Sequence, residues 1–313
     1  MPTYSPVFRD PALEQQFTRE GYVVIPMLDA DEIATLRRLY QAPNQAESGS
    51  FYTTYKLRDG AMRRHIADVM SPLLKPHIER LMPGSLTRSH GVMVKPPVAD
   101  PQPVPLHQDF TSVDLEKHRA LQLWIPLIDV DESNGCLKLV AGSHSLAPHI
   151  SAMLLNPSPY RKVREILDAD ATTTVPVKAG TAVLFDQRML HGSTPNISGL
   201  TRVSVGALII PADVKQLLFV EDLTTPGNLH VMEMEDEFAV ELGGGMITPP
   251  FPEGLKHIGD IHYSARFLTE EEIEPIRLRH TVGSKKAVAA VPVEPHPHQR
   301  APASGFFRRL FGG

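Results

Sequence analysis

The sequence has very little cysteine and no long apolar run. Only Cys136 among its 313 residues is a cysteine, which excludes a disulfide within one chain and a zinc site built from several thiolates. No apolar stretch approaches the roughly 18 residues of a membrane-spanning helix. The first ten residues also lack the apolar core of a secretory signal peptide. We therefore expect a cytoplasmic protein without a transmembrane segment.

A large positive charge and the common hydrolase motifs are absent as well. The net charge is −5, which gives no reason to expect nucleic acid as a partner. Neither a Gly-x-Ser-x-Gly elbow nor a His-Glu-x-x-His motif occurs, so a hydrolase has little support. Proline, in contrast, is abundant at 29 residues, roughly 9% where about 5% is typical. This abundance favours a loop-rich β protein over a helical bundle.

The C-terminal stretch 284–313 differs in composition from the rest of the chain. It carries five basic residues against one acidic residue and is rich in proline and alanine, which is typical of a disordered tail. Its last nine residues, GFFRRLFGG, combine aromatic and basic side chains. This ending could also dock on an anionic membrane surface or on a protein partner. We expect residues 1–283 to form one domain.

The N-terminal part of this domain has helical patterns. Apolar spacing predicts helices over 10–22 and 29–41, with a short strand over 22–25 between them. A third helix is expected over 62–81, with a break near Pro72 and Pro76. The polar stretch 41–60 is expected to form a loop.

From residue 86 the pattern changes to alternating and β-branched runs. We expect strands near 86–95, 120–130, 136–141, 172–177, 181–185 and 202–210. Asn134-Gly135 predicts a tight hairpin between two of these runs. Helices followed by many short strands predict a mainly β fold, a jelly roll, with the N-terminal helices packed on it. The expected core is 86–211, and 212–283 is expected to be elaboration around it.

The most informative motif is Pro105-Leu106-His107-Gln108-Asp109. On an extended strand, His107 and Asp109 project to the same face. An imidazole and a carboxylate presented together are two ligands of the 2-His-1-carboxylate facial triad that holds iron(II). His191, which follows the strand over 181–185, is the candidate third ligand. Arg202 opens the next strand, and its guanidinium in a metal-containing pocket would suit a carboxylate.

Four stretches of the chain resemble one known family. They are FTREGYVVIPMLDADEIATLRR, PLHQD, LQLWIPLIDVDESNGCLKLVAGSHS and MLHGSTPNISGLTRVSV, spread over about two-thirds of the chain between Phe17 and Ile210. In this order they are similar to the phytanoyl-CoA dioxygenase family of iron(II)- and 2-oxoglutarate-dependent oxygenases. The resemblance implies a double-stranded β-helix, or jelly-roll, core and a reaction that consumes Fe(II)-bound O2 and 2-oxoglutarate. Such enzymes hydroxylate a small or medium organic molecule and release succinate and CO2.

The resemblance also implies roles for particular residues. The metal ligands of the family fall on His107, Asp109 and His191, and the arginine that holds the distal carboxylate of 2-oxoglutarate falls on Arg202. Ser193 and Trp124 match positions that line the cosubstrate site, although Trp124 could equally be core. The presence of Asp109 argues against the halogenating relatives, in which a small residue replaces the carboxylate.

Four further residues are candidates for the substrate pocket. Gln122 shares a strand face with Trp124, and Lys95 ends a strand, where it either orients substrate or cosubstrate or is only solvated. Tyr55 and Lys56 could belong to a lid over the pocket. A different class of function also stays open, in which the jelly roll has lost its chemistry and serves as a metal-binding regulatory module.

Overall fold

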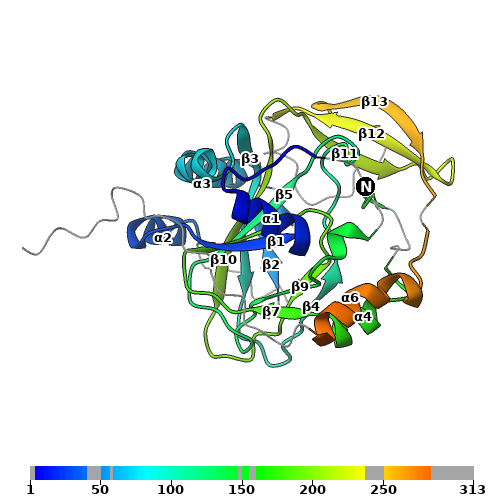
Figure 1. Ribbon diagram of the computed structural model, residues 1–313. Coiled ribbons are helices and arrows are strands. Elements are labelled where there is room, and N and C mark those ends of the chain that lie inside the picture. Colours follow the sequence, from blue (N-terminus) through cyan, green and yellow to red (C-terminus); the bar gives the residue numbers. More distant parts are fainter. Residues whose placement is uncertain are drawn as a thin grey trace, which may run out of the picture.

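Two antiparallel sheets lie face to face, and helices cover the outer side of the larger one (Figure 1). The computed structural model describes residues 4–40, 51–56, 59–146, 150–154, 160–236, 250–264 and 266–282. The expected tail over 284–313 lies outside these residues, and so does most of the loop expected over 41–60. Within the described residues, no helix has both the length and the apolarity to cross a bilayer.

The larger sheet has six strands in the order β1-β8-β5-β10-β3-β2. These are β1 (Tyr22–Pro26), β8 (Thr181–Asp186), β5 (Leu121–Pro126), β10 (Arg202–Pro211), β3 (Ser85–Lys95) and β2 (Tyr52–Thr53). The smaller sheet has the order β4-β9-β6-β7. Its strands are β4 (Val104–His107), β9 (His191–Ser193), β6 (Leu137–Leu139) and β7 (Thr173–Val175). These two sheets form the predicted jelly-roll core.

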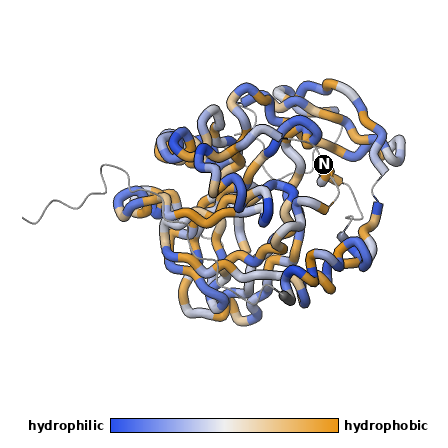
Figure 2. The backbone as a smooth tube through the Cα atoms, viewed as in Figure 1, coloured by the Kyte–Doolittle hydropathy of each residue, from blue (hydrophilic) through white to orange (hydrophobic). Residues whose placement is uncertain are grey.

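Alternation along the strands sends apolar side chains to both faces of the larger sheet. On β10, Val203 and Val205 point outward and join an apolar cluster with the helices α1 (Pro11–Glu20), α2 (Ala30–Arg37) and α3 (Gly60–Leu81). On β5, Trp124 points inward and joins the layer between the two sheets. Much of the tube through this region is coloured as hydrophobic in Figure 2. The inward face of β10 therefore opens into the space between the sheets, where Arg202 lies.

Two local predictions were wrong. The helix α3 runs without a break through Pro72 and Pro76. Its buried side chains at spacings of four, Ile66, Met70, Leu74 and Ile78, pack on the sheet, and this burial outweighs the roughly 3 kcal/mol that an internal proline costs. The Asn134-Gly135 turn does not close a hairpin, because β5 before it and β6 after it belong to different sheets. Only Gly135 has a positive φ there, of 90°, so the turn carries the chain from one sheet to the other.

The stretch after the core contains more regular structure than the sequence predicted. A third sheet has the order β11-β12-β13, made of β11 (Gln216–Glu221), β12 (Asn228–Met234) and β13 (Leu255–His262). The helix α6 (Glu270–Val282) then packs with α4 (Arg164–Asp170) beside the smaller sheet. The remaining elements are the short 3-10 helices η1 (Thr54–Lys56) and η2 (Ser143–Ser145).

Candidate functional site

Pairing between β4 and β9 brings the predicted metal ligands together. His107 is the last residue of β4 and lies directly opposite His191, the first residue of β9, so their ring centroids are 4.3 Å apart. Asp109 lies in the loop just after β4 rather than on the strand. Its Oδ1 is 3.5 Å from Nε2 of His107, and its Oδ2 is 3.6 Å from Nε2 of His191. One ligand atom from each residue lies within 4.8 Å of the other two.

A glycine allows this close approach of the two strands. A Cβ on Gly192, between His191 and Ser193, would lie 2.4 Å from the carbonyl oxygen of Val104. A side chain at this position would push β9 away from β4 and separate the imidazoles, so the site requires glycine there.

Backbone carbonyl groups fix the orientation of both imidazole rings. The Nδ1 atom of His107 lies 2.9 Å from the carbonyl oxygen of Pro105, and that of His191 lies 3.1 Å from the carbonyl oxygen of Met189. A carbonyl oxygen can only accept, so each Nδ1 carries the proton and each Nε2 keeps a free lone pair. Both lone pairs belong to the nitrogens that face Asp109, which is the arrangement that metal-binding histidines adopt.

The protonation states suit a divalent cation. Burial alone would raise the pKa of Asp109, but the imidazoles of His191 and His107 outweigh it and bring the pKa down to about 2. Burial, together with His107, lowers the pKa of His191 to about 4. Burial alone would lower the pKa of His107, but the hydrogen bond and charge of Asp109 outweigh it and raise that pKa, so a bound cation would have to displace this proton. An ionised carboxylate and neutral imidazoles are the forms that coordinate a metal, and these three residues fit an iron(II) ion in that state.

Two buried cations lie on the neighbouring part of the barrel. Arg202 opens β10 and is paired in register with Lys95, which ends β3. Arg202 is 2% exposed and Lys95 is fully buried. The Nζ of Lys95 donates to Oγ of Ser193, 3.0 Å away, and Ser193 is two residues beyond His191 on β9. Ser193 therefore connects the cation pair to the strand that holds the candidate metal ligand His191.

This cation pair has no balancing negative charge among the described residues. Burial lowers the pKa of Arg202 to about 10, and burial together with Arg202 lowers the pKa of Lys95 to about 7. No carboxylate among the described residues contributes to either shift. Nη1 of Arg202 donates to Oγ of Ser204 over 2.7 Å, but its Nε is buried without a partner. Buried charge and an orphaned donor are costly, so this corner suits a carboxylate ligand.

The other predicted residues surround the same space. Trp124 faces Arg202, with 5.8 Å between its ring and the guanidinium carbon, and Gln122 shares its strand face. Tyr55 lies across the inner face of β10, since a Cβ on Gly206 would be 3.2 Å from its hydroxyl. Burial, together with the charge of Asp109, raises the pKa of Tyr55. The side chain of Lys56 lies outside the described residues.

Three residues of the site were not predicted from the sequence. Phe185 packs against His191 with 4.7 Å between ring centroids, Phe51 lies 5.9 Å from the guanidinium carbon of Arg202, and Ser204 accepts from it. Alternation along β10 places Ser204 on the face of Arg202, so this pattern could have identified it. In the sequence, Phe185 cannot be distinguished from the other apolar residues of the buried strand β8, so no signal could have identified it.

Sequence comparisons relate the chain to oxygenases. Residues 17–204 match the family model described as phytanoyl-CoA dioxygenase. Phytanoyl-CoA dioxygenase 1 of Oryza sativa subsp. japonica is 27% identical over 114 residues, which cover 34% of this chain and 38% of the relative. Ectoine dioxygenase of Bordetella parapertussis is 31% identical over 118 residues, with 32% and 38% covered. The matched segments thus span less than half of these relatives.

Solved structures share the fold. The carbocyclase SnoK of nogalamycin biosynthesis, described as non-heme and alpha ketoglutarate dependent, superposes with a TM-score of 0.50 at 21% identity, covering 69% of this chain and 89% of SnoK. The epimerase SnoN of the same biosynthesis gives 0.50 at 24% identity, covering 80% and 95%. At these identities the likeness concerns the fold alone. Because the family model covers more than half of the residues, the chain belongs to the phytanoyl-CoA dioxygenase family.

Proposed function

We propose that this protein is an iron(II)- and 2-oxoglutarate-dependent dioxygenase that hydroxylates a C–H bond of a small or medium organic molecule. Iron(II) held by His107, Asp109 and His191 would couple oxidation of the substrate by O2 to decarboxylation of 2-oxoglutarate into succinate and CO2. Three protein ligands leave three coordination positions for cosubstrate and O2. The observation that carries the proposal is the uncompensated pair Arg202 and Lys95, joined through Ser193 to the strand of a metal ligand.

The side chains have separable tasks in this proposal. The guanidinium of Arg202 would bind the distal carboxylate of 2-oxoglutarate, with Ser204 holding the guanidinium in place and Trp124 excluding water from this corner. Lys95 would add a second positive charge beside Ser193. Tyr55 and Gln122 would line the volume left for the organic substrate.

The first experiment is an anaerobic titration of the Fe(II)-loaded protein with 2-oxoglutarate. Chelation of the cosubstrate to ferrous iron is expected to give a weak visible charge-transfer band, which His191→Ala should abolish. If iron binds to the folded protein and no band forms, the pocket does not hold 2-oxoglutarate. The alternative function, a metal-binding regulatory module without oxygenase chemistry, would then take precedence.

Lys95 supplies a test that depends on pH. Its lowered pKa, about 7 in the free protein, should rise when a dianion binds beside it, because an adjacent negative charge favours the protonated amine. Above pH 7, binding of 2-oxoglutarate should therefore take up nearly one proton, and affinity should fall as pH increases. Well below pH 7 the amine is already charged in the free protein, so proton uptake should vanish.

Calorimetry of the metal-loaded protein at pH 8, in buffers of different ionisation enthalpy, measures this uptake. Lys95→Met should bind without it, whereas Lys178→Met, whose partner is the exposed Asp129, serves as a control for the loss of a lysine. Equal proton uptake in Lys95→Met and in the unchanged protein would contradict a role for Lys95 at the cosubstrate.

A further inference from the structure

A second cluster of metal-binding side chains lies on the third sheet, beyond the residues that match the family model. It consists of His230 on β12 with His257 and Asp260 on β13, and we call it the sheet cluster. One donor atom from each lies within 4.8 Å of the other two. In Figure 1 this sheet lies at the upper right, whereas β4 and β9 lie in the lower part of the molecule, so the sheet cluster is separate from the site described above.

An irregularity in β13 brings the three side chains to one face. His257 and Asp260 are three residues apart, and in a regular strand they would point to opposite faces. The register between β12 and β13 shifts, however: His230 pairs with Asp260, while Met232, two residues on, pairs with His257. The extra residue of this bulge re-aims His257 onto the face of Asp260, and bulges recur where a side chain has to be redirected. Gly259, within the bulge, has a φ of 156°.

The donor atoms already converge on one point. Oδ1 of Asp260 accepts from Nδ1 of His230 over 2.6 Å and from Nε2 of His257 over 2.8 Å. The side chains of His257 and Asp260 are 44% and 48% exposed, and that of His230 is 17% exposed. A cation could therefore reach the sheet cluster from solvent.

A second carboxylate stands behind His230. Oδ1 of Asp222, just after β11, lies 3.8 Å from Nε2 of His230 and is held in place by the backbone N–H and hydroxyl of Thr224. If Nδ1 of His230 bound a metal, its proton would move to Nε2, which faces this carboxylate. A metal-bound histidine with an acidic group on its other nitrogen is a common arrangement.

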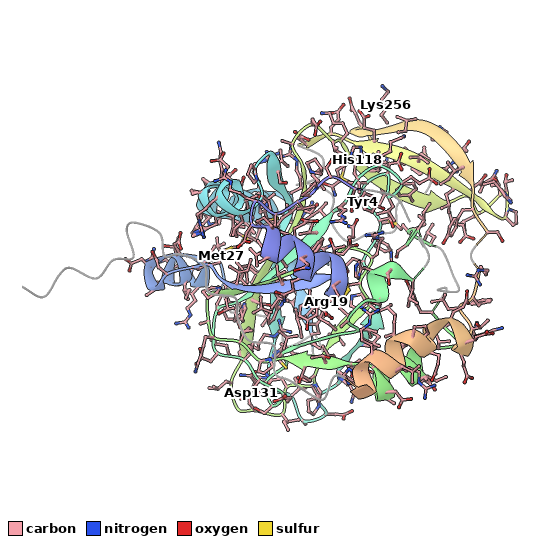
Figure 3. All side chains as sticks on the ribbon, viewed as in Figure 1. Tyr4, Arg19, Met27, His118, Asp131 and Lys256 are labelled. Carbon is pink, nitrogen blue, oxygen red and sulfur yellow. The ribbon has the colours of Figure 1, made fainter. Side chains whose placement is uncertain are left out.

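The charges around the sheet cluster favour a divalent cation. Asp222 and Asp260 bring two negative charges, and among the described residues neither forms an ion pair with lysine or arginine. Lys256, the neighbour of His257, extends away from the sheet into solvent in Figure 3. Two imidazoles and one carboxylate suit zinc, which takes three protein ligands and a water in tetrahedral geometry.

We propose that His230, His257 and Asp260 form a second metal site, which binds Zn²⁺ and fastens β13 to β12. The ion would replace the two N–H protons that now lie on Oδ1 of Asp260, and water would complete its coordination. Since His107, Asp109 and His191 would also bind a divalent metal under the proposed function, the experiment must separate the two sites.

The experiment measures Zn²⁺ binding by equilibrium dialysis and metal analysis on a chain with Asp109→Ala and His191→Ala, which removes the barrel site. This chain should retain one Zn²⁺. Adding His257→Ala should weaken its affinity at least about 100-fold, and adding Asp222→Asn about 10-fold or more, the range for outer partners of a ligand. His262→Ala is the matched control, because His262 is exposed on the same strand but lies beside Asn228.

Two further measurements test whether a loss of Zn²⁺ binding comes from misfolding. One is thermal unfolding of the variants, and the other is the same substitution in a chain whose barrel site is intact. Zn²⁺ should raise the Tm of the barrel-deleted chain and of its His262→Ala form, but not of its His257→Ala form. In a chain with an intact barrel site, His257→Ala should lower the number of bound Zn²⁺ ions per chain from two to one. A barrel-deleted chain that binds no Zn²⁺, or equal affinities in the His257→Ala and His262→Ala forms, would show that the sheet cluster is only a hydrogen-bonded clamp.

Discussion

Replacing Asp109 with alanine is expected to lower turnover by at least about 10³-fold, because a metal ion loses its only anionic protein ligand. Asp109 also sets the protonation of its surroundings, since it lies between the Nε2 atoms of His107 and His191. Without it, the two imidazoles face each other with no negative charge between them. Iron affinity should therefore fall together with the rate.

The loss of turnover can be measured without knowing the natural substrate. Enzymes of the proposed type can be followed through succinate formed from 2-oxoglutarate in the presence of iron and O2, which reports the half-reaction that precedes attack on the substrate. Asp100→Ala, at an exposed position in the loop before β4, controls for the loss of an acidic side chain. Succinate formation within threefold of the unchanged protein in Asp109→Ala would remove Asp109 from the metal site.

Much of the core was predictable because its strands carry local signals. The strands β3, β8 and β10 lie within one residue of the expected ranges 86–95, 181–185 and 202–210. The strands β8 and β10 are runs of mostly apolar or β-branched side chains that are buried at nearly every position, the pattern expected where both faces of a sheet are covered. The strand β3 carries such a run only in its second half, from Val92 to Val94. The helices over the outer face of this sheet were predictable because each buries one apolar face against it, which gives a helical spacing of apolar residues.

The smaller sheet carries weaker signals. The strands β4 and β9 have only four and three residues, too few for a period to appear, and their pairing depends on contacts across more than 80 positions of sequence. Residue types and order identified His107 and His191 as partners, but only the fold shows that they lie directly opposite each other. Pairing of this kind is set by tertiary structure, as is the passage of α3 through two prolines.

The sheet cluster could not have been predicted from the spacing of its residues in the sequence. His257 and Asp260 are three residues apart on a strand, so alternation would separate them, and only the bulge unites them. His230 comes from another strand, and none of the three belongs to a short motif. A site assembled by a register shift leaves no pattern in the sequence.

Replacing Arg202 with glutamine is expected to raise the KM for 2-oxoglutarate by about 10²- to 10³-fold, with a smaller change in kcat at saturation. A buried, charge-assisted bond to a carboxylate contributes roughly 3–4 kcal/mol when its loss leaves the ligand charge unpaired. Arg202→Lys keeps the charge but loses the planar guanidinium, so its KM for 2-oxoglutarate should lie between those of the unchanged protein and Arg202→Gln. Arg37→Gln is the control, since Arg37 donates to the backbone carbonyl of Leu127 on the outer side of the barrel.

Stability distinguishes this role from a structural one. A buried arginine that serves the fold is paired, and its removal destabilises the protein. Arg202 has a donor without a partner and lies beside Lys95, so the free protein bears a buried positive charge that an anionic ligand would offset. Arg202→Gln should therefore leave the Tm of the ligand-free protein unchanged or raise it, while 2-oxoglutarate should no longer increase it. A large drop in the Tm of the ligand-free variant, with the KM unaltered, would mean that Arg202 holds the barrel together instead of binding the cosubstrate.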